Sequence, residues 1–230
     1  MNPQLIGQGA HGCVYYPGYN CKGHISDTKN VSKLVLDNEI TRNEYKVCNI
    51  IKKKIKNYDK YFIIQEDMCK ISPKIFLSIK TDNCEMPLNK SYIMFHSKYL
   101  NSKELADYIQ NYEITNLQLL KWFIAICKRI RLLQNVNMIH MDMHFSNILV
   151  GENMNLHIID FGLVLNQTEF FKNEKLNLDY LKSKWYESCL SWKSWTLEYN
   201  LIGMIIKEKK TITKKLIKTS IEQYYNYNNK

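Results

Sequence analysis

Long apolar segments are missing from this sequence of 230 residues, and its glycines and prolines are few, at 8 and 4. No run approaches the roughly 18 uncharged apolar residues that a membrane-spanning helix requires. The first residues have neither the basic region nor the apolar region of a signal peptide. No repeat, linker or low-complexity block divides the chain. We therefore expect a soluble intracellular protein that contacts no membrane.

Paired cysteine motifs are also missing. The 7 cysteines are scattered singly, without a C-x-x-C pair or a Cys/His cluster at the spacing of a zinc site. Their odd number and the lack of a secretory signal argue against a disulfide framework. We expect reduced thiols, most of them buried.

Acidic residues are outnumbered by basic ones, which gives a formal net charge of +10. Lysine clusters attract phosphates, so the charge by itself would allow nucleic-acid binding. The densest run, at Lys52, Lys53, Lys54 and Lys56, falls on the solvated face of a predicted helix, and no nucleic-acid-binding motif accompanies it. We therefore expect no nucleic-acid partner, and the sequence does not indicate an oligomeric state.

The first half of the chain is rich in short apolar runs that are typical of strands, with one segment of helical spacing among them. The composition is 45% apolar, which suffices for one sizeable core. The predicted strands are 5–6, 13–16, 31–36, 61–64 and 91–95, and the predicted helix covers about 39–55.

The second half is predicted to be mainly helical. Residues 116–134 carry a wide apolar stripe and form the clearest helix of the chain. Further predicted helices are 101–109, 199–206 and 213–225, and two short strands, 148–150 and 157–159, are joined by a turn at 151–155. The pattern indicates one α+β domain with a strand-rich first lobe and a helical second lobe.

Residues 7–14 have the spacing G-x-G-x-x-G-x-V, with glycines at Gly7, Gly9 and Gly12. Glycines in such a turn let backbone amides approach phosphate oxygens. An ordinary hairpin would also use them. A dinucleotide-binding fold is disfavoured, because a strand and not a helix is predicted to follow the turn.

Two further motifs follow in the second half. His140, Asp142 and Asn147 have the spacing H-x-D-x-x-x-x-N, and Asp160-Phe161-Gly162 follows the second short strand as D-F-G. Either motif could occur by chance, but both in this order, downstream of the glycine-rich turn, are specific.

With these three motifs the chain resembles the eukaryotic-type protein kinases over about residues 4–198. The segments 31–34 and 59–62 look most like the compact serine/threonine kinases encoded by large cytoplasmic DNA viruses. The resemblance implies a two-lobed protein-kinase-like fold in one domain: a small antiparallel-sheet N-lobe with one main helix (about 1–97) and a reduced, mainly helical C-lobe (about 98–230). It also implies ATP, Mg²⁺ with Mn²⁺ as an alternative, a protein substrate, and a location in the host cytoplasm or a virion.

The resemblance places the nucleotide site in the first lobe. The residues expected to bind ATP are Ile6, Gly7, Gly9, Gly12, Val14, Val31 and Lys33. Lys33 would contact the α- and β-phosphates, and a helix carboxylate should pair with it. Glu44 is our choice for that carboxylate, with Glu39 as the alternative. Without the motifs, Lys33 would read as a surface lysine on a strand.

In the second lobe, the resemblance makes Asp142 the catalytic base that orients the incoming hydroxyl, while Asn147 and Asp160 coordinate magnesium. Structural alternatives are a turn cap for Asp142 and backbone hydrogen bonding for Asn147. We expect His140 to brace the loop.

Two positions depart from the family pattern. Met141 stands where many protein kinases carry an arginine that receives an activation-loop phosphate, so we expect activity independent of such phosphorylation. His144 stands where serine/threonine kinases place a lysine that steadies the γ-phosphate, and we expect its imidazole to do related catalytic work. It also makes H-x-D-x-H resemble small-molecule kinases of the aminoglycoside and choline type. A small-molecule kinase therefore remains an alternative.

The end of the chain matches the family least. We align Glu198 with the glutamate of the A-P-E motif, although the nearby aromatic residues would serve equally well as core. The helices that usually complete the second lobe are not visible in the pattern. This indicates a minimal or truncated kinase and leaves a nucleotide-binding pseudokinase as the second alternative.

Overall fold

The computed structural model describes residues 2–9, 12–79, 84–87, 89–166 and 168–169. The chain divides into two compact units. The first unit consists of Met1–Asn101 with Ile159–Leu163, and the second of Ser102–Ile158 with Val164–Lys230. Among the described helices, none has the length and apolar character needed to cross a membrane.

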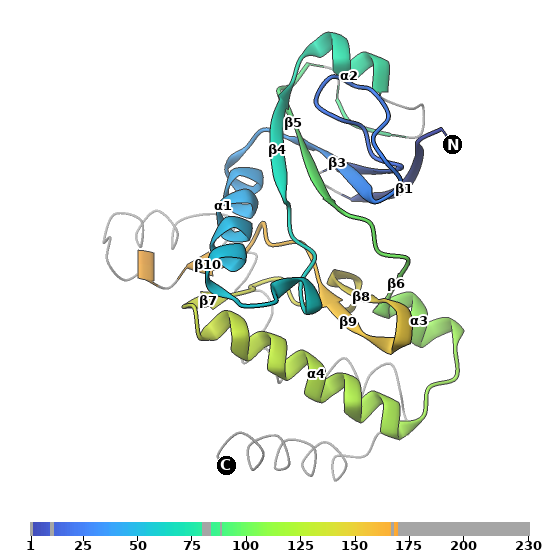
Figure 1. The fold of residues 1–230 in the computed structure, drawn as a ribbon, viewed down its shortest axis with the longest axis vertical. Coiled ribbons are helices and arrows are strands. Elements are labelled where there is room, and N and C mark those ends of the chain that lie inside the picture. Colours follow the sequence, from blue (N-terminus) through green and yellow to red (C-terminus); the bar gives the residue numbers. More distant parts are fainter. Residues whose placement is uncertain (1, 10–11, 80–83, 88, 167, 170–230) are drawn as a thin grey trace. The chain divides into compact units, whose positions relative to one another are not determined.

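The first unit contains a five-stranded antiparallel sheet with the order β1-β2-β3-β5-β4 (Figure 1). Its strands are β1 (Gln4–Gly9), β2 (Gly12–Tyr16), β3 (Asn30–Leu36), β4 (Asp67–Ile71) and β5 (Tyr92–Lys98). β5 is buried along most of its length because it lies between β3 and β4. The antiparallel sheet confirms the α+β prediction.

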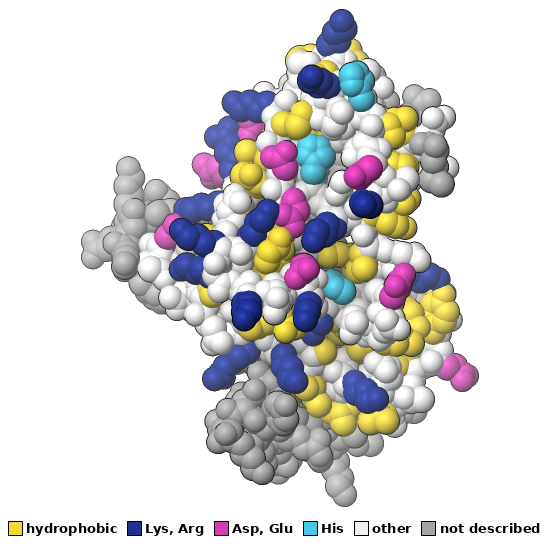
Figure 2. Space-filling model, viewed as in Figure 1, with side chains coloured by type: hydrophobic (Ala, Val, Ile, Leu, Met, Phe, Trp, Pro, Cys, Tyr) yellow, Lys and Arg dark blue, Asp and Glu magenta, His cyan; other side chains and the backbone are white. Residues whose placement is uncertain are grey.

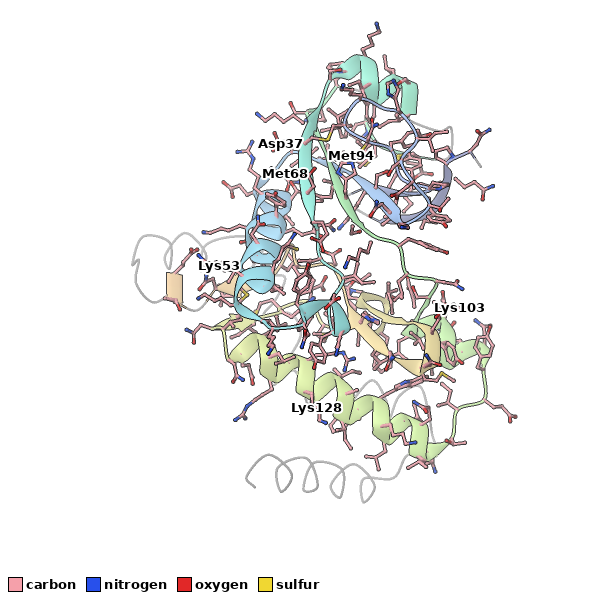
Figure 3. All side chains as sticks on the ribbon, viewed as in Figure 1. Asp37, Lys53, Met68, Met94, Lys103 and Lys128 are labelled. Carbon is pink, nitrogen blue, oxygen red and sulfur yellow. A yellow bond between two sulfur atoms is a disulfide. The ribbon has the colours of Figure 1, made fainter. Side chains whose placement is uncertain are left out.

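Helix α1 (Glu39–Lys54) begins at a capping box in which Asn38 accepts a hydrogen bond from the Thr41 amide and Thr41 accepts one from the Asn38 amide. Three lysines occupy its last turn, where positive charge is favourable, and Lys53 among them points away from the helix (Figure 3). Basic side chains are spread over the face of the molecule that Figure 2 shows. Val47, Cys48 and Ile51 lie on its buried face. The observed bounds agree with the predicted helix.

The two faces of this sheet have separate apolar clusters. Met94 belongs to the cluster that β2, β3 and β5 share with the short helix α2 (Pro73–Ile79), whereas Met68 packs with Val35, Ile93 and Phe95 (Figure 3). Tyr45 of α1 packs on this second cluster. Alternation along β3 therefore leaves the face that carries Lys33 next to α1.

The strand predicted at 61–64 is wrong. A short 3₁₀ turn, η1 (Tyr58–Lys60), precedes this segment, and the strand comes later, at β4. Phe62 and Ile64 are buried, but outside the sheet, and Phe62 packs edge-on against Phe161 at 5.9 Å between ring centroids. An apolar run indicates burial and does not by itself indicate strand pairing.

The prediction of reduced thiols is also wrong for four cysteines. Disulfides join Cys13 to Cys84 and Cys21 to Cys69, with Cα–Cα distances of 6.1 and 5.9 Å. The partners are 71 and 48 residues apart in the sequence, so the tertiary fold brings them together and no local spacing shows it. Cys48 is a buried free thiol and Cys127 is also buried, as predicted, and Cys189 lies outside the described residues.

The second unit is built on α4 (Asn116–Gln134), whose bounds equal the predicted ones. Its other elements are β6 (Lys103–Glu104), α3 (Leu105–Asn111), β7 (Met138–Ile139), η2 (Phe145–Asn147), β8 (Ile148–Val150), η3 (Glu152–Met154), β9 (Leu156–Ile158) and β10 (Leu165–Asn166). One sheet has the order β6-β8-β9, and β10 pairs with β7. The helix predicted from residue 101 starts later because Lys103 and Glu104 pair with β8.

Polar anchors tie α4 to the β8–β9 hairpin. The indole of Trp122 donates a hydrogen bond to the Met154 carbonyl at 3.0 Å. The buried guanidinium of Arg129 donates to the Leu156 carbonyl at 2.9 Å and to the Ala125 carbonyl at 2.7 Å. The hairpin therefore has a fixed position on the helix. The helices predicted at 199–206 and 213–225, with Glu198, lie outside the described residues.

Candidate active site

The glycine-rich turn joins β1 to β2, with Gly9 opposite Gly12 in the ladder. A Cβ atom on Gly12 would lie 2.3 Å from the Leu34 carbonyl oxygen, so the sheet itself requires glycine there. Among the residues that the structure describes, a Cβ on Gly9 would meet no atom within 4 Å, and one on Gly7 would only touch Val14 at 3.8 Å. The protein's own packing therefore does not explain these two glycines, and both leave room for a ligand beside the backbone.

The apolar residues predicted to cover a nucleotide base lie on strands of the same sheet. Ile6 is 51% exposed on β1, which is high for a large apolar side chain. Val14 stands opposite Lys33 in the β2–β3 ladder, and Val31 lies two residues before Lys33 on the same face of β3. Val14 on the neighbouring strand and Val31 on the same strand therefore flank Lys33, and Ile6 lies one strand further along the sheet.

Lys33 lies between two carboxylates of the first unit. Its ammonium nitrogen is 3.2 Å from both carboxylate oxygens of Glu44 and 3.6 Å from Oδ2 of Asp160. Burial by itself would lower the pKa of Lys33, but Glu44 and Asp160 outweigh burial and raise it above its ordinary value. Lys33 is therefore charged at neutral pH, and the two carboxylates hold its ammonium group in place.

Glu44 is the helix carboxylate in this arrangement, while Glu39 is exposed in the first turn of α1. The side chain of Glu44 is 2% exposed, and the amide of Gln65 donates a further hydrogen bond to it at 2.9 Å. Burial raises the pKa of Glu44, whereas Lys33 and Gln65 oppose this shift by stabilising the charged form. Nothing in the sequence marked Gln65, because a glutamine has no motif of its own.

The segment Asp160-Phe161-Gly162 is attached to α1. The Asn43 amide donates a hydrogen bond to the Gly162 carbonyl at 3.0 Å, and a Cβ on Gly162 would lie 2.8 Å from Cγ2 of Ile40. Phe161 is buried. Asp160 has a φ of 61°, a left-handed conformation that is uncommon outside glycine, and its side chain is 40% exposed. These contacts present its carboxylate beside Lys33.

Three predicted residues meet in a loop of the second unit. The Asn147 amide donates to the Asp142 carbonyl at 2.9 Å and to Oδ2 of Asp142 at 3.1 Å. Nε2 of His144 lies 3.7 Å from the same Oδ2. His144 lowers the pKa of Asp142 most, burial opposes it, and His140 and Asn147 lower it further. Asp142 is therefore ionised at neutral pH.

His140 is buried at the base of this loop, and its backbone carbonyl accepts a hydrogen bond from the Asp142 amide. The loop between β7 and β8 thus positions Asp142 through its own backbone and through Asn147. All of these contacts are local in sequence, which is why a spacing motif could find them.

Two of the predicted residues offer oxygen donors of the kind that Mg²⁺ prefers. Both hydrogen bonds of Asn147 toward Asp142 use its amide nitrogen, so neither occupies its carbonyl oxygen. Asp160 adds a partly exposed carboxylate. The donor chemistry fits a magnesium ion, but Asn147 and Asp160 belong to different units, so a shared metal site stays a prediction.

A separate set of possible metal ligands lies in the first unit. The ligand atoms of Cys21, Cys69 and His96 are within 4.8 Å of one another. The two sulfurs are bonded to each other. A disulfide has no thiolate to offer, so in this state the group does not fit a metal ion.

The chain belongs to the protein kinase family: residues 2–188 match the model of the protein kinase domain. It is 34% identical over 65 residues to the serine/threonine-protein kinase shk2 of Schizosaccharomyces pombe, which covers 28% of this chain and 11% of the relative. It is 23% identical over 128 residues to the mitogen-activated protein kinase PMK1 of Pyricularia oryzae, which covers 52% of this chain and 36% of the relative. It is 35% identical over 81 residues to the serine/threonine-protein kinase kin-29 of Caenorhabditis elegans, which covers 35% of this chain and 10% of the relative.

The family membership confirms the resemblance to eukaryotic-type protein kinases and the protein-kinase-like α+β fold. The chain spans little more than a third of PMK1 and about a tenth of the other two relatives. The narrower resemblance to viral kinases is not tested by these relatives and stays a prediction.

Proposed function

We propose that this protein transfers the γ-phosphoryl group of ATP, with Mg²⁺ or Mn²⁺, to serine or threonine hydroxyls of a protein substrate. The observation that carries the proposal is the position of Lys33 between Glu44 and Asp160. A charged lysine with a fixed ammonium group, beside a partly exposed carboxylate, suits the binding of a phosphate chain and its metal ion.

The residues of the first unit bind and orient in this proposal. Gly7 and Gly9 leave room beside the hairpin backbone, and the Lys33 ammonium neutralises phosphate oxygens. Bound ATP supplies the phosphoryl group, and the metal ion balances its negative charge. Glu44 keeps Lys33 in place, and Gln65 keeps Glu44 in place.

Asp142 is the proposed base. Its lowered pKa keeps the carboxylate ionised, so Oδ1 or Oδ2 accepts the hydroxyl proton of the substrate and orients the attacking oxygen. Asn147 orients this residue through one hydrogen bond to the Asp142 carboxylate and one to the Asp142 backbone carbonyl. Met141 next to Asp142 has no charge to bind a phosphate, which supports activity without activation-loop phosphorylation.

A second candidate function is a small-molecule kinase. His144, 3.7 Å from Asp142, stands where a lysine is usual in protein serine/threonine kinases, and the pattern H-x-D-x-H resembles aminoglycoside and choline kinases. A metabolite hydroxyl would need the same base. The two candidates therefore differ in the acceptor and not in the chemistry.

The experiment supplies γ-labelled ATP and Mg²⁺ to the full chain, with basic and acidic proteins in one series and amino-alcohol metabolites in another. We expect labelled phosphoserine or phosphothreonine, lost in Lys33→Ala and Asp160→Ala and kept in the exposed control Lys29→Ala. Label on metabolites alone would replace the proposal with the second candidate. Nucleotide binding without any transfer would indicate a pseudokinase.

A further inference from the structure

The two disulfides of the first unit differ in exposure, although Cys69 packs against the same apolar cluster that contains Cys13 and Cys84. Cys13 and Cys84 are 0% and 1% exposed and belong to the apolar cluster beneath α2. Cys21 and Cys69 are each partly exposed. An external thiolate must approach a disulfide sulfur directly, so accessibility decides which of the two bonds can react in the folded protein.

The partly exposed disulfide, Cys21–Cys69, joins a turn to a strand. Cys69 lies in β4, opposite Met94 of β5. Cys21 lies in the turn between β2 and β3, where the Asn20 side chain accepts hydrogen bonds from the Lys22 and His24 amides. Cys21 therefore lies in an ordered turn outside the sheet ladder, whereas Cys69 is part of the ladder.

His96 lies beside the Cys21–Cys69 disulfide. One of its ring nitrogens and the sulfurs of Cys21 and Cys69 lie within 4.8 Å of one another. Nε2 of His96 is 2.9 Å from the Tyr19 carbonyl, which fixes the ring, and Nδ1 is 4.0 Å from the Asp67 carboxylate. An imidazole so placed stabilises a neighbouring thiolate, above all when it is protonated.

The connection from β2 to β3 has other anchors besides the bond. The Tyr19 amide donates to the Ser32 hydroxyl at 2.9 Å, and the Gly18 amide donates to the Asn30 carbonyl at 2.9 Å. These contacts and the sheet ladder do not use the sulfurs of Cys21 and Cys69, so we expect them to persist when the bond opens. The bond can therefore break without unfolding of the unit.

We propose that Cys21–Cys69 is a thiol–disulfide exchange site for small cysteine-containing thiols, with His96 stabilising the leaving thiolate. The thiolate of the small thiol attacks Sγ of Cys21, forming a mixed disulfide, and the electron pair of the broken bond goes to Sγ of Cys69 beside His96. A second small thiol attacks the mixed disulfide and releases Cys21 as a thiolate. The protein disulfide gains two electrons, and two small thiols become one disulfide.

The test exposes the folded full chain to graded reduced glutathione, alkylates new thiols at intervals and locates them by mass spectrometry. We expect Cys21 and Cys69 to be labelled at least roughly tenfold faster than Cys13 and Cys84, because a buried bond needs local opening first. Labelling of both pairs at one rate, or of Cys13 and Cys84 first, would overturn the proposal.

Single-thiol variants provide a second readout. In Cys69→Ser the remaining Cys21 should form a mixed disulfide with oxidised glutathione under native conditions, whereas in the matched variant Cys84→Ser the remaining Cys13 should do so only in denaturant. Equal reaction of both variants while folded would contradict the proposal. His96→Gln should slow the opening of the bond without lowering the melting temperature, and an unchanged rate would remove His96 from the site.

Discussion

The candidate residues of the first unit come together from distant parts of the chain, whereas those of the second unit lie in one loop. Lys33, Glu44, Gln65 and Asp160 come from β3, α1 and two segments outside the regular elements, and they meet through side-chain contacts. Asp142, His144 and Asn147 are at most five residues apart. The first arrangement depends on the tertiary fold, and the second depends mainly on the local backbone.

The two sets of candidate residues therefore suit different roles in phosphoryl transfer. The contacts of the first unit hold a charged lysine in place, which suits the binding of phosphates, and those of the second unit orient one carboxylate, which suits proton transfer. Variants of the first group should therefore change stability and nucleotide affinity together. Variants of the second group should change the rate of transfer and leave the fold intact.

The largest effect is expected from Asp142→Asn. This change removes the proposed base but keeps the size of the side chain, so kcat should fall about 10²–10⁴-fold while the melting temperature stays near that of the wild type. Steady-state kinetics and thermal unfolding measure the two quantities. Asp59→Asn, an exposed substitution, serves as the control, and a retained kcat in Asp142→Asn would refute the assignment of the base.

Glu44→Gln should produce the next largest effect. It leaves Lys33 with one carboxylate fewer and weakens two charged hydrogen bonds, so the free energy of unfolding should fall by about 1.5–3 kcal/mol and KM for ATP should rise. Glu39→Gln is the matched control on the same helix, with an expected change within about 0.5 kcal/mol. Equal losses in the two variants, measured by urea unfolding, would show that the Lys33–Glu44 pair has no special role.

A smaller contrast is expected within the glycine-rich turn. Gly12→Ala forces a Cβ against the Leu34 carbonyl and should cost about 1–3 kcal/mol of stability. Gly9→Ala meets open space in the protein, so its stability should change by less than about 0.5 kcal/mol. If Gly9 makes room for phosphates, its alanine variant should nevertheless bind ATP more weakly in calorimetry. Unchanged ATP affinity in Gly9→Ala would count against that role.

The smallest effect concerns pH. The pKa of Asp142 lies below its ordinary value in the folded protein, so the stabilisation from its carboxylate is present above the ordinary pKa and is lost as the pH falls through the lowered value. His144→Asn removes the main cause of the shift and should move the acid limb of kcat/KM to higher pH. His24→Asn, an exposed histidine in the first unit, should not. If the acid limb of kcat/KM does not shift in His144→Asn, His144 does not set the pKa of Asp142.

The same difference between local and distant contacts determines how much of the fold and of the candidate site the sequence predicts. Periodicity alone predicts helix α4, and a spacing motif places His140, Asp142 and Asn147 in one loop, because these contacts are local. The roles of the loop residues, and the pairing of Lys33 with Glu44, need the family resemblance as well. Gln65 and Asn43 carry no signal in the sequence. The disulfides were missed for the same reason, since their partners lie 48 and 71 residues apart.

Transfer of labelled γ-phosphate from Mg-ATP by the wild-type chain, with nucleotide binding measured on the same preparation, tests the central claim most directly. We expect the chain to bind the nucleotide and to pass the label to serine or threonine hydroxyls. A chain that is folded and binds Mg-ATP, but transfers no label to any protein or metabolite hydroxyl, would contradict the claim that these residues form a working phosphotransferase.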